Sequence, residues 1–176
     1  MLTIQNTPFP TLNTERLTLR LLTYADDHAL FRLRSDGRVN RFLDRPPTTT
    51  LGDARTFIEK IETAIKNGES FYWVIALKNE DALIGTICYW NLVKEDDQAE
   101  IGYELHPDFQ GKGIMQEAIT AVLRFGFEQL KLKTITAFPR QDNRKSIQLL
   151  EKNNFSVDSG IQTEEAYVAY VLRANP

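Results

Sequence analysis

The sequence predicts a single α/β domain with a mixed central β-sheet of about seven strands and helices on both faces. Its 176 residues fit one domain, and no repeat, low-complexity tract or linker divides them, so residues 1–176 are expected to fold together. Adjoining strand-like stretches favour antiparallel hairpins, whereas strand–helix–strand units late in the chain favour some parallel pairing. Together these patterns indicate a mixed sheet.

The first half of the chain is expected to begin with a strand and two helices. Arg16 to Leu22 alternates apolar and polar residues, as a half-buried strand does. Helical spacing follows from Tyr24 to Asp36, and the proline- and threonine-rich RPPTTTLGD predicts a loop. The second helix runs from Asp53 to Lys66, with apolar residues along one face, and Asn67-Gly68 is a typical helix end.

Three strands are expected next, because three stretches are rich in β-branched and aromatic residues or alternate in polarity. They read FYWVIAL, ALIGTICYW and QAEIGYEL, and the turn-like KNED joins the first two. A glycine-containing run at positions 106–115 then leads into a long helix that reaches about Leu130.

The last part of the chain is expected to alternate between strand and helix. TITAFP is a strand closed by Pro139, and DNRKSIQLLEKN is a shorter helix for which Asp142 or Asn143 is a plausible N-cap. FSVDSG and AYVAYVL are the last two strands. This order supplies the strand–helix–strand units on which the mixed sheet depends.

Composition and charge exclude several classes of protein. The chain is 42% hydrophobic and 26% charged, as globular proteins are, and its net charge of −3 argues against a nucleic-acid binder. The N-terminus does not resemble a secretory signal, and no apolar run is long enough to span a bilayer. The single Cys88, expected to be a small buried core residue, favours a reducing, cytoplasmic compartment. No Cys or His pair has zinc spacing, so no metal is expected.

The run HPDFQGKGIM (106–115) places two glycines between a strand and the start of a helix. A helix start offers unpaired N–H groups to an anion, and glycines let a phosphate approach the main chain. The alternative is a flexible turn. A Walker loop would need Ser or Thr after Gly111-Lys112, and a dinucleotide fingerprint would need glycine in place of Gln116 and an acid in place of Phe138-Pro139. Both of these rivals fail.

The residues around the glycines resemble one family. QGKGIM (110–115) resembles the coenzyme A pyrophosphate loop of the GNAT N-acetyltransferase superfamily. AEIGYELHP and TERLTLRLL look like strands of its branch typified by the RimJ and RimL ribosomal-protein acetyltransferases, and NRKSIQLLEKNNF (143–155) is similar to that branch's Asn-x-x-Ser helix. Met115 departs from the usual Gly or Ala, Asn154 from a common Gly, and Leu150 stands where many members have a general-acid tyrosine.

The resemblance implies that the protein transfers an acetyl group from acetyl-coenzyme A to an amine by direct attack, without a metal. The amine would belong to a protein N-terminus or to a small molecule. Ser146 would protonate the leaving thiolate, although a serine there can also serve only as a partner of the helix cap. The implied cofactor-binding residues are Leu105, Gln110, Gly111, Lys112, Gly113, Ile114, Met115, Asn143 and Ser146.

The general base is expected on the strand QAEIGYEL. Alternation places Glu100, Gly102 and Glu104 on one face and Ala99, Ile101 and Tyr103 on the other. Carboxylates on an interior strand suggest a wet cleft, in which partial burial can raise a carboxylate pKa. The resemblance makes Glu100 the first candidate for the base, acting through a water molecule. Glu104, on the same face of the strand, is the second candidate. Glu164 and Glu165 are alternative candidates, because they match a glutamate of the branch loosely. Each strand carboxylate could instead pair with a Lys or Arg.

The acceptor pocket is expected around residues 40–50 and 162–167, where Arg41, Phe42 and Leu43 could line it. The sequence does not identify the acceptor. The resemblance makes a homodimer plausible. A different class of function, a non-catalytic coenzyme A-binding regulatory module, stays open because the family's tyrosine is replaced.

Overall fold

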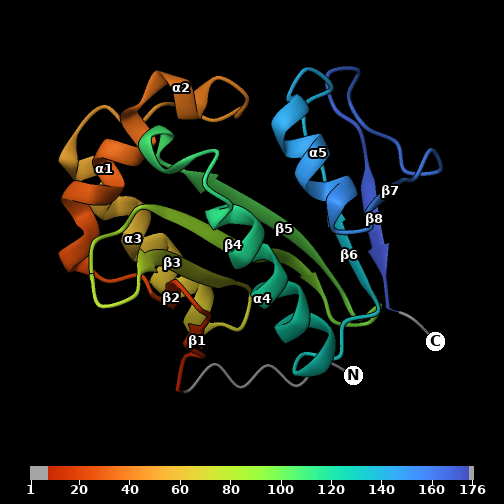
Figure 1. Ribbon diagram of the computed structural model, residues 1–176, viewed down its shortest axis with the longest axis horizontal. Coiled ribbons are helices and arrows are strands. Elements are labelled where there is room, and N and C mark those ends of the chain that lie inside the picture. The colour runs from red at the N-terminus through yellow and green to blue at the C-terminus, as the bar shows by residue number, and fades with distance from the viewer. Residues whose placement is uncertain (1–7, 175–176) are drawn as a thin grey trace.

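The computed structural model describes residues 8–174, whose strands form one sheet in the order β1-β2-β3-β4-β5-β6-β8-β7 (Figure 1). Neighbouring strands are antiparallel except β5 and β6, which are parallel. The predicted mixed sheet is confirmed, with eight strands rather than about seven, because the dipeptide β1 is too short to show alternation. The strands are β1 (Leu12–Asn13), β2 (Leu17–Leu21), β3 (Phe71–Leu77), β4 (Gly85–Val93), β5 (Gln98–Leu105), β6 (Thr134–Ala137), β7 (Ser156–Val157) and β8 (Tyr170–Arg173).

Helices cover both faces of the sheet, as predicted. One core packs α4 and α5 against β2 to β6 and β8 around Trp73 and Tyr89, and a second packs α1 and α3 on the opposite face around Tyr72 and Val74. Among residues 8–174, the helices are too short or too polar to span a lipid bilayer. The helices are α1 (Asp27–Ser35), α2 (Gly37–Asn40), α3 (Leu51–Lys66), α4 (Ile114–Glu128) and α5 (Arg144–Lys152), with 3-10 turns η1 (Tyr24–Asp26) and η2 (Pro107–Phe109).

Several helix boundaries differ from the predicted ones. The second predicted helix begins at Leu51 rather than Asp53, because Thr50 caps it: the Thr50 hydroxyl accepts from the Asp53 N–H, and the Asp53 carboxylate accepts from the Thr50 N–H. The predicted loop RPPTTTLGD is therefore shorter. The first predicted helix is divided into η1 and α1, the four-residue α2 was not predicted, and α4 ends at Glu128.

The last strands are shorter than predicted. β7 and β8 keep only part of FSVDSG and AYVAYVL, because residues 166–169 lie beside 139–141 instead. There the Val168 N–H donates to the Pro139 carbonyl, and Arg140 and Tyr167 form an isolated bridge. This segment thus runs along the loop that joins β6 to α5.

The sheet splits between β5 and β6. The two strands pair only from Gln98–Glu100 to Thr134–Thr136, although β5 continues to Leu105 and β6 ends at Ala137. Figure 1 shows the part that contains α5, β6 and β8 diverging from the part that contains α1 and α2, with β5 between them. Polar groups on the outer half of β5 can therefore face open space instead of a neighbouring strand.

Candidate active site

The loop between β5 and α4 has a backbone that requires glycine. Gly111 and Gly113 both have φ of +74°, in the left-handed region where other residues are strained, and Gly113 is the N-cap of α4. A Cβ on Gly111 would meet open space, whereas one on Gly113 would lie 3.4 Å from Arg16 Nη2. The glycines thus set the path of the main chain into the helix.

The N–H groups of this loop point to no protein acceptor. Among the described residues, none of the backbone N–H groups of residues 111–115 makes a hydrogen bond, whereas those of Gln110 and Glu117 on either side do. Ile114 is buried in the core and Met115 packs against it, so both side chains hold the helix start while their N–H groups stay available. A row of free donors at the start of a 15-residue helix suits an anion.

Cationic side chains surround the loop. Arg16 binds Glu117 through Nε at 2.6 Å and the Lys112 carbonyl through Nη1 at 3.0 Å. Lys112 Nζ lies 5.6 Å from the centre of the Phe109 ring, and Lys145 Nζ donates to Gln110 Oε1 at 3.3 Å. Positive charge at the rim of the free N–H groups strengthens their attraction for an anion.

Two predicted cofactor residues hold the protein's own structure. The Gln110 side chain donates to the Leu105 carbonyl at 3.0 Å and so ties the loop to the end of β5. The Asn143 side chain is the N-cap of α5 and accepts from the Ser146 N–H at 3.3 Å. The cap was predicted at Asp142 or Asn143, and Asn143 is confirmed.

Side chains alternate along β5 as predicted, so Glu100 and Glu104 point to the face covered by α1 and α3. The Glu100 carboxylate accepts from Asn91 Nδ2 at 2.9 Å, and burial raises the pKa of Glu100, an effect that this hydrogen bond partly offsets. No cation pairs with Glu100 among residues 8–174. It therefore has the properties expected of a base.

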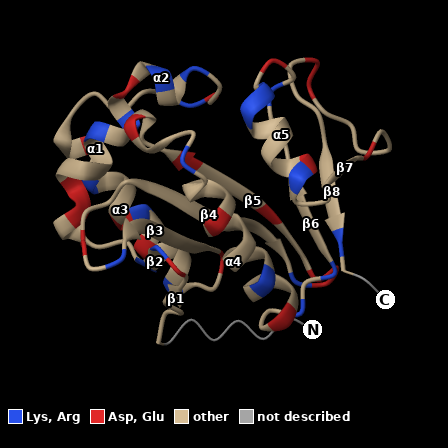
Figure 2. Ribbon diagram, in the orientation of Figure 1, with Lys and Arg blue, Asp and Glu red and all other residues tan. Residues whose placement is uncertain are grey.

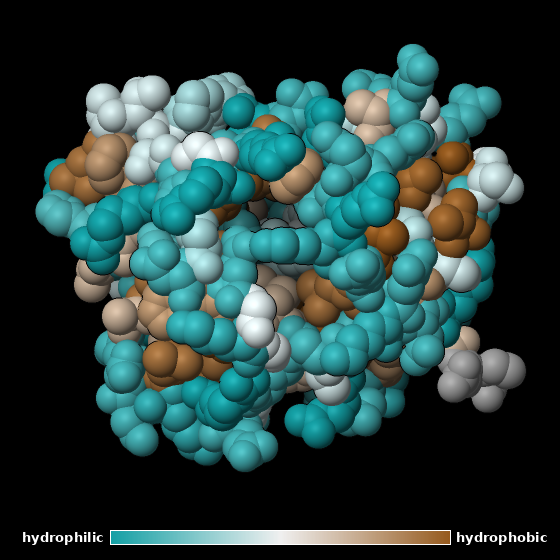
Figure 3. Space-filling view, turned by 45° about the horizontal axis from the view of Figure 1, so that its top comes forward, coloured by the Kyte–Doolittle hydropathy of each residue, from teal (hydrophilic) through white to brown (hydrophobic). Residues whose placement is uncertain are grey.

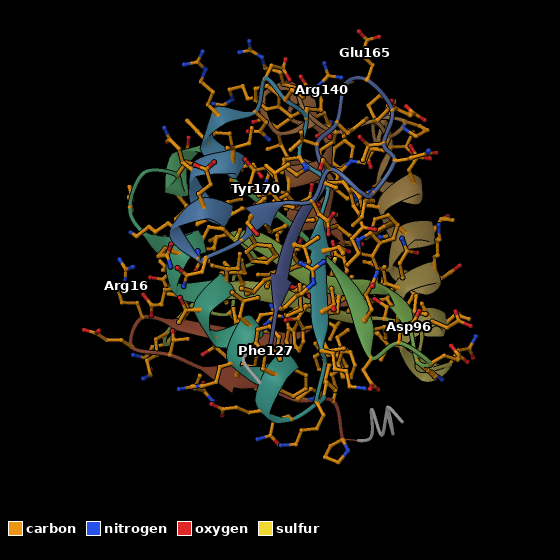
Figure 4. All side chains as sticks on the ribbon, turned by 90° about the vertical axis from the view of Figure 1, so that its right-hand side faces the viewer. Arg16, Asp96, Phe127, Arg140, Glu165 and Tyr170 are labelled. Atoms are coloured by element: carbon orange, nitrogen blue, oxygen red, sulfur yellow. The ribbon has the colours of Figure 1, made fainter. Side chains whose placement is uncertain are left out.

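Glu104 has a different environment. Its carboxylate binds Arg45 Nη2 at 2.6 Å and Arg34 Nη1 at 3.4 Å, and its side chain is 8% exposed. These contacts favour the alternative, pairing with arginine, over the role of base. Glu164 and Glu165 are exposed, and Figure 4 shows Glu165 pointing away from the molecule at its upper edge.

On the opposite face of β5 the structure brings Tyr103 to Ser146. The two hydroxyl oxygens lie 2.7 Å apart, and either can be the donor. Burial raises the pKa of Tyr103 to about 12. Alternation along the strand predicts that Tyr103 lies on this face, but it does not say which helix covers the face, so no role for Tyr103 follows from the sequence.

A cavity of about 780 Å³ occupies the split between β5 and β6 and joins both faces of β5. Figure 3 shows the surface hollowed near the centre of the view, and Figure 2 shows basic residues in α2 and at the start of α5. Phe42 and Leu43 line the cavity as expected, whereas the Arg41 guanidinium lies over the Phe42 ring. The lining that matters for chemistry comprises Arg34, Arg45, Glu100, Tyr103, Glu104 and Ser146.

Cys88 also lines this cavity. It packs against the second core but is only partly buried, so the expectation of a buried core residue holds in part. Burial raises the pKa of its thiol to about 12, and the charge of Glu104 adds to this effect. A thiol with so high a pKa is a poor nucleophile at neutral pH.

The mixed sheet agrees with the fold that the element order predicts, and the free N–H groups where β5 leads into α4 agree with the pyrophosphate loop that the resemblance to the GNAT superfamily implies. The acetyltransferase (GNAT) domain family matches residues 16–156, and the chain belongs to this family. The chain is 35% identical over 156 residues to the N-acetyltransferase p20 of Bacillus licheniformis, covering 88% of this chain and 87% of the relative.

Other relatives confirm the resemblance to the RimJ and RimL branch. The [ribosomal protein uS5]-alanine N-acetyltransferase of Escherichia coli is 28% identical over 158 residues, covering 85% of this chain and 80% of that enzyme. The structure of RimL, the ribosomal L7/L12 alpha-N-protein acetyltransferase, in complex with coenzyme A superposes with a TM-score of 0.82 at 20% identity, covering 93% and 98% of the two chains. The protein is thus an N-acetyltransferase.

Proposed function

We propose that the protein moves an acetyl group from acetyl-coenzyme A to an amine, on a protein N-terminus or on a small molecule, by direct attack of the amine on the thioester. The observation that carries the proposal is the row of free N–H groups at residues 111–115. A diphosphate supplies the acceptors that these donors lack, and Lys112 adds positive charge at the rim, whereas the charge of Arg16 is compensated by Glu117. The names of the relatives favour this enzyme over a regulatory module that only binds coenzyme A.

In the proposed reaction, the amine nitrogen forms a bond to the thioester carbon and the carbon–sulfur bond breaks. Glu100 removes a proton from the amine through water, for which its raised pKa and the lack of a cation paired with it among residues 8–174 suit it. The sulfur leaves as a thiolate and takes a proton from the Ser146 hydroxyl, and the proton held by Glu100 returns to the serine oxygen through water. Tyr103 orients the Ser146 hydroxyl for this step. When Tyr103 donates its hydrogen bond to Ser146, the hydrogen of the Ser146 hydroxyl is free to point into the cavity.

The cofactor assignment is tested by a change at Gly113. Gly113→Asp adds negative charge where we expect a diphosphate, so calorimetry should show loss of acetyl-coenzyme A binding. Gly113→Asn is the matched control, because Asn has the same shape and tolerates the left-handed conformation without charge. Unchanged affinity in Gly113→Asp would contradict a diphosphate at this loop, and a greater loss in Gly113→Asp than in Gly113→Asn would assign the loss to charge.

Turnover is tested by following thiol release from acetyl-coenzyme A with a panel of amines, and by mass spectrometry of the acetylated products. We expect release that depends on the amine. Tight binding of acetyl-coenzyme A without release for any amine would favour the regulatory module. A cytoplasmic location stays a prediction.

A further inference from the structure

Two arginines enclose one carboxylate in the wall of the cavity. Arg34 comes from α1, Arg45 from the loop between α2 and α3, and Glu104 from β5. Arg45 makes the short contact with Glu104, at 2.6 Å, and Arg34 the longer one, at 3.4 Å. The cluster therefore carries one excess positive charge.

Arg34 is the less well compensated of the two. Its side chain is only 11% exposed, and its Nε is buried without a hydrogen-bond partner among the described residues. The guanidinium carbon lies 3.8 Å from the centre of the Phe57 ring, and this cation–π contact offsets only part of the cost of burial. A buried cation with such partners is stabilised by an anion that enters the cavity.

The anion that meets this cluster is not expected to be the phosphate of acetyl-coenzyme A. Arg34 and Arg45 lie on the face of β5 that α1 and α3 cover, whereas the loop at 111–115 starts α4, which packs on the opposite face. The same face of β5 carries Glu100, the proposed base. Of the two substrates, the amine that accepts the acetyl group is therefore the one expected between Glu100 and the arginines.

Gly102 separates these two ends of the site. It lies between Glu100 and Glu104 on their face of β5, and its missing side chain leaves the floor open beside Cys88, whose Sγ is 3.4 Å from where a Cβ would stand. Four residues of strand span about 13 Å between the Cα atoms of the two glutamates. The floor suits a molecule longer than an α-amino acid.

We infer that the acceptor is an amine that carries a carboxylate several bonds away, as a dipeptide or an ω-amino acid does, and that Arg34 and Arg45 bind this carboxylate while the amine lies near Glu100. The inference rests on the proposed function and names the class of its acceptor. Guanidinium groups match carboxylates in geometry and charge, and such hydrogen bonds are stronger than neutral ones.

The test compares acceptors that differ only in the carboxylate. Thiol release from acetyl-coenzyme A is measured with glycylglycine against glycylglycinamide, and with 6-aminohexanoate against its amide, at fixed ionic strength. We expect the KM of the wild-type protein to be about tenfold or more lower for each carboxylate, since hydrogen bonds to charged groups are strong. Equal KM values would overturn the inference alone, and no release with any acceptor would overturn the proposed function together with it.

A pair of variants assigns the effect to Arg34. Arg34→Met should remove the preference for the carboxylates and leave the KM for acetyl-coenzyme A unchanged. Arg32→Met is the matched control, because Arg32 is an exposed arginine on the same helix, and it should keep the preference. A raised KM for acetyl-coenzyme A with the preference intact would overturn the inference. If Arg34→Met does not fold, the comparison on the wild-type protein decides.

Discussion

The hydroxyl groups of Tyr103 and Ser146 lie 2.7 Å apart and join β5 to the first turn of α5. Ser146 is the proposed donor of the proton that the leaving thiolate takes. A serine hydroxyl has one hydrogen and free rotation, so a fixed partner decides where that hydrogen points. Tyr103 is therefore best described as a positioning residue that acts through Ser146.

This relationship predicts non-additive kinetics. Ser146→Ala should lower kcat by about 100-fold or more, as removal of a general acid does, with little change in the Kd of acetyl-coenzyme A. Tyr103→Phe should lower kcat by about tenfold, the effect of one hydrogen bond. The double variant should resemble Ser146→Ala alone, because Tyr103 has no role once the serine hydroxyl is gone.

Steady-state kinetics and calorimetry on the three variants check this prediction. Effects of Tyr103→Phe and Ser146→Ala that multiply in the double variant would show that Tyr103 does not act through Ser146. A serine hydroxyl that only accompanies the Asn143 cap would leave kcat unchanged in Ser146→Ala. Thermal unfolding of each variant shows whether the fold is intact.

Glu100 gives a prediction in which activity and stability move in opposite directions. Glu100→Gln should lower kcat/KM by about 100-fold or more, since the amide cannot take a proton. Burial raises the pKa of Glu100 above its ordinary value, so the folded protein disfavours its charged form. Protonated Glu100 therefore contributes to the unfolding free energy below the pKa that it has in the unfolded chain. This contribution is lost as the pH rises through its higher pKa in the folded protein.

The unfolding free energy of Glu100→Gln should therefore equal that of the wild-type protein near pH 4 and exceed it at pH 7. Gln keeps an oxygen that can accept from Asn91, so that hydrogen bond need not be lost. Urea denaturation at the two pH values measures the difference. A variant less stable than wild type at pH 7, with unchanged activity, would mean that Glu100 is a structural residue.

Gly126 gives a prediction about packing between α4 and the sheet. Gly126 lies in α4, where Ala has the higher helix propensity by about 1 kcal/mol. A Cβ at this position would lie 2.5 Å from the Tyr89 hydroxyl oxygen, which donates to the Val122 carbonyl at 3.0 Å. Gly126→Ala should therefore destabilise the protein by roughly 1–3 kcal/mol, as overpacking does.

A double variant separates this clash from a general defect in α4. In Tyr89→Phe the hydroxyl is absent, so adding Gly126→Ala should cost less than it does in the wild-type protein. Chemical denaturation of the four proteins gives the coupling energy. Costs that simply add, or a stabilising Gly126→Ala, would contradict close packing of Tyr89 on Gly126.

Features that depend on neighbouring residues can be predicted from the amino-acid sequence alone. Alternation along QAEIGYEL placed Glu100 and Glu104 on one face of β5, and the glycine run marked the start of α4. Asn154 stands where Gly is common in the family, and its φ of +64° lies in the left-handed region that Asn tolerates better than most residues. Alternation, capping and positive φ arise from interactions within a few residues, and a short window of sequence contains them.

Contacts between residues far apart in the chain become visible in the folded structure. Tyr103 and Ser146 are 43 positions apart, and Glu104 is 59 and 70 positions from the arginines it binds. Glu104 pairs with two arginines because α1 and the loop after α2 lie against its face of the sheet. The cavity forms because β5 and β6 pair over only part of their length. These contacts depend on the register of segments far apart in the chain, which no local pattern of residues encodes.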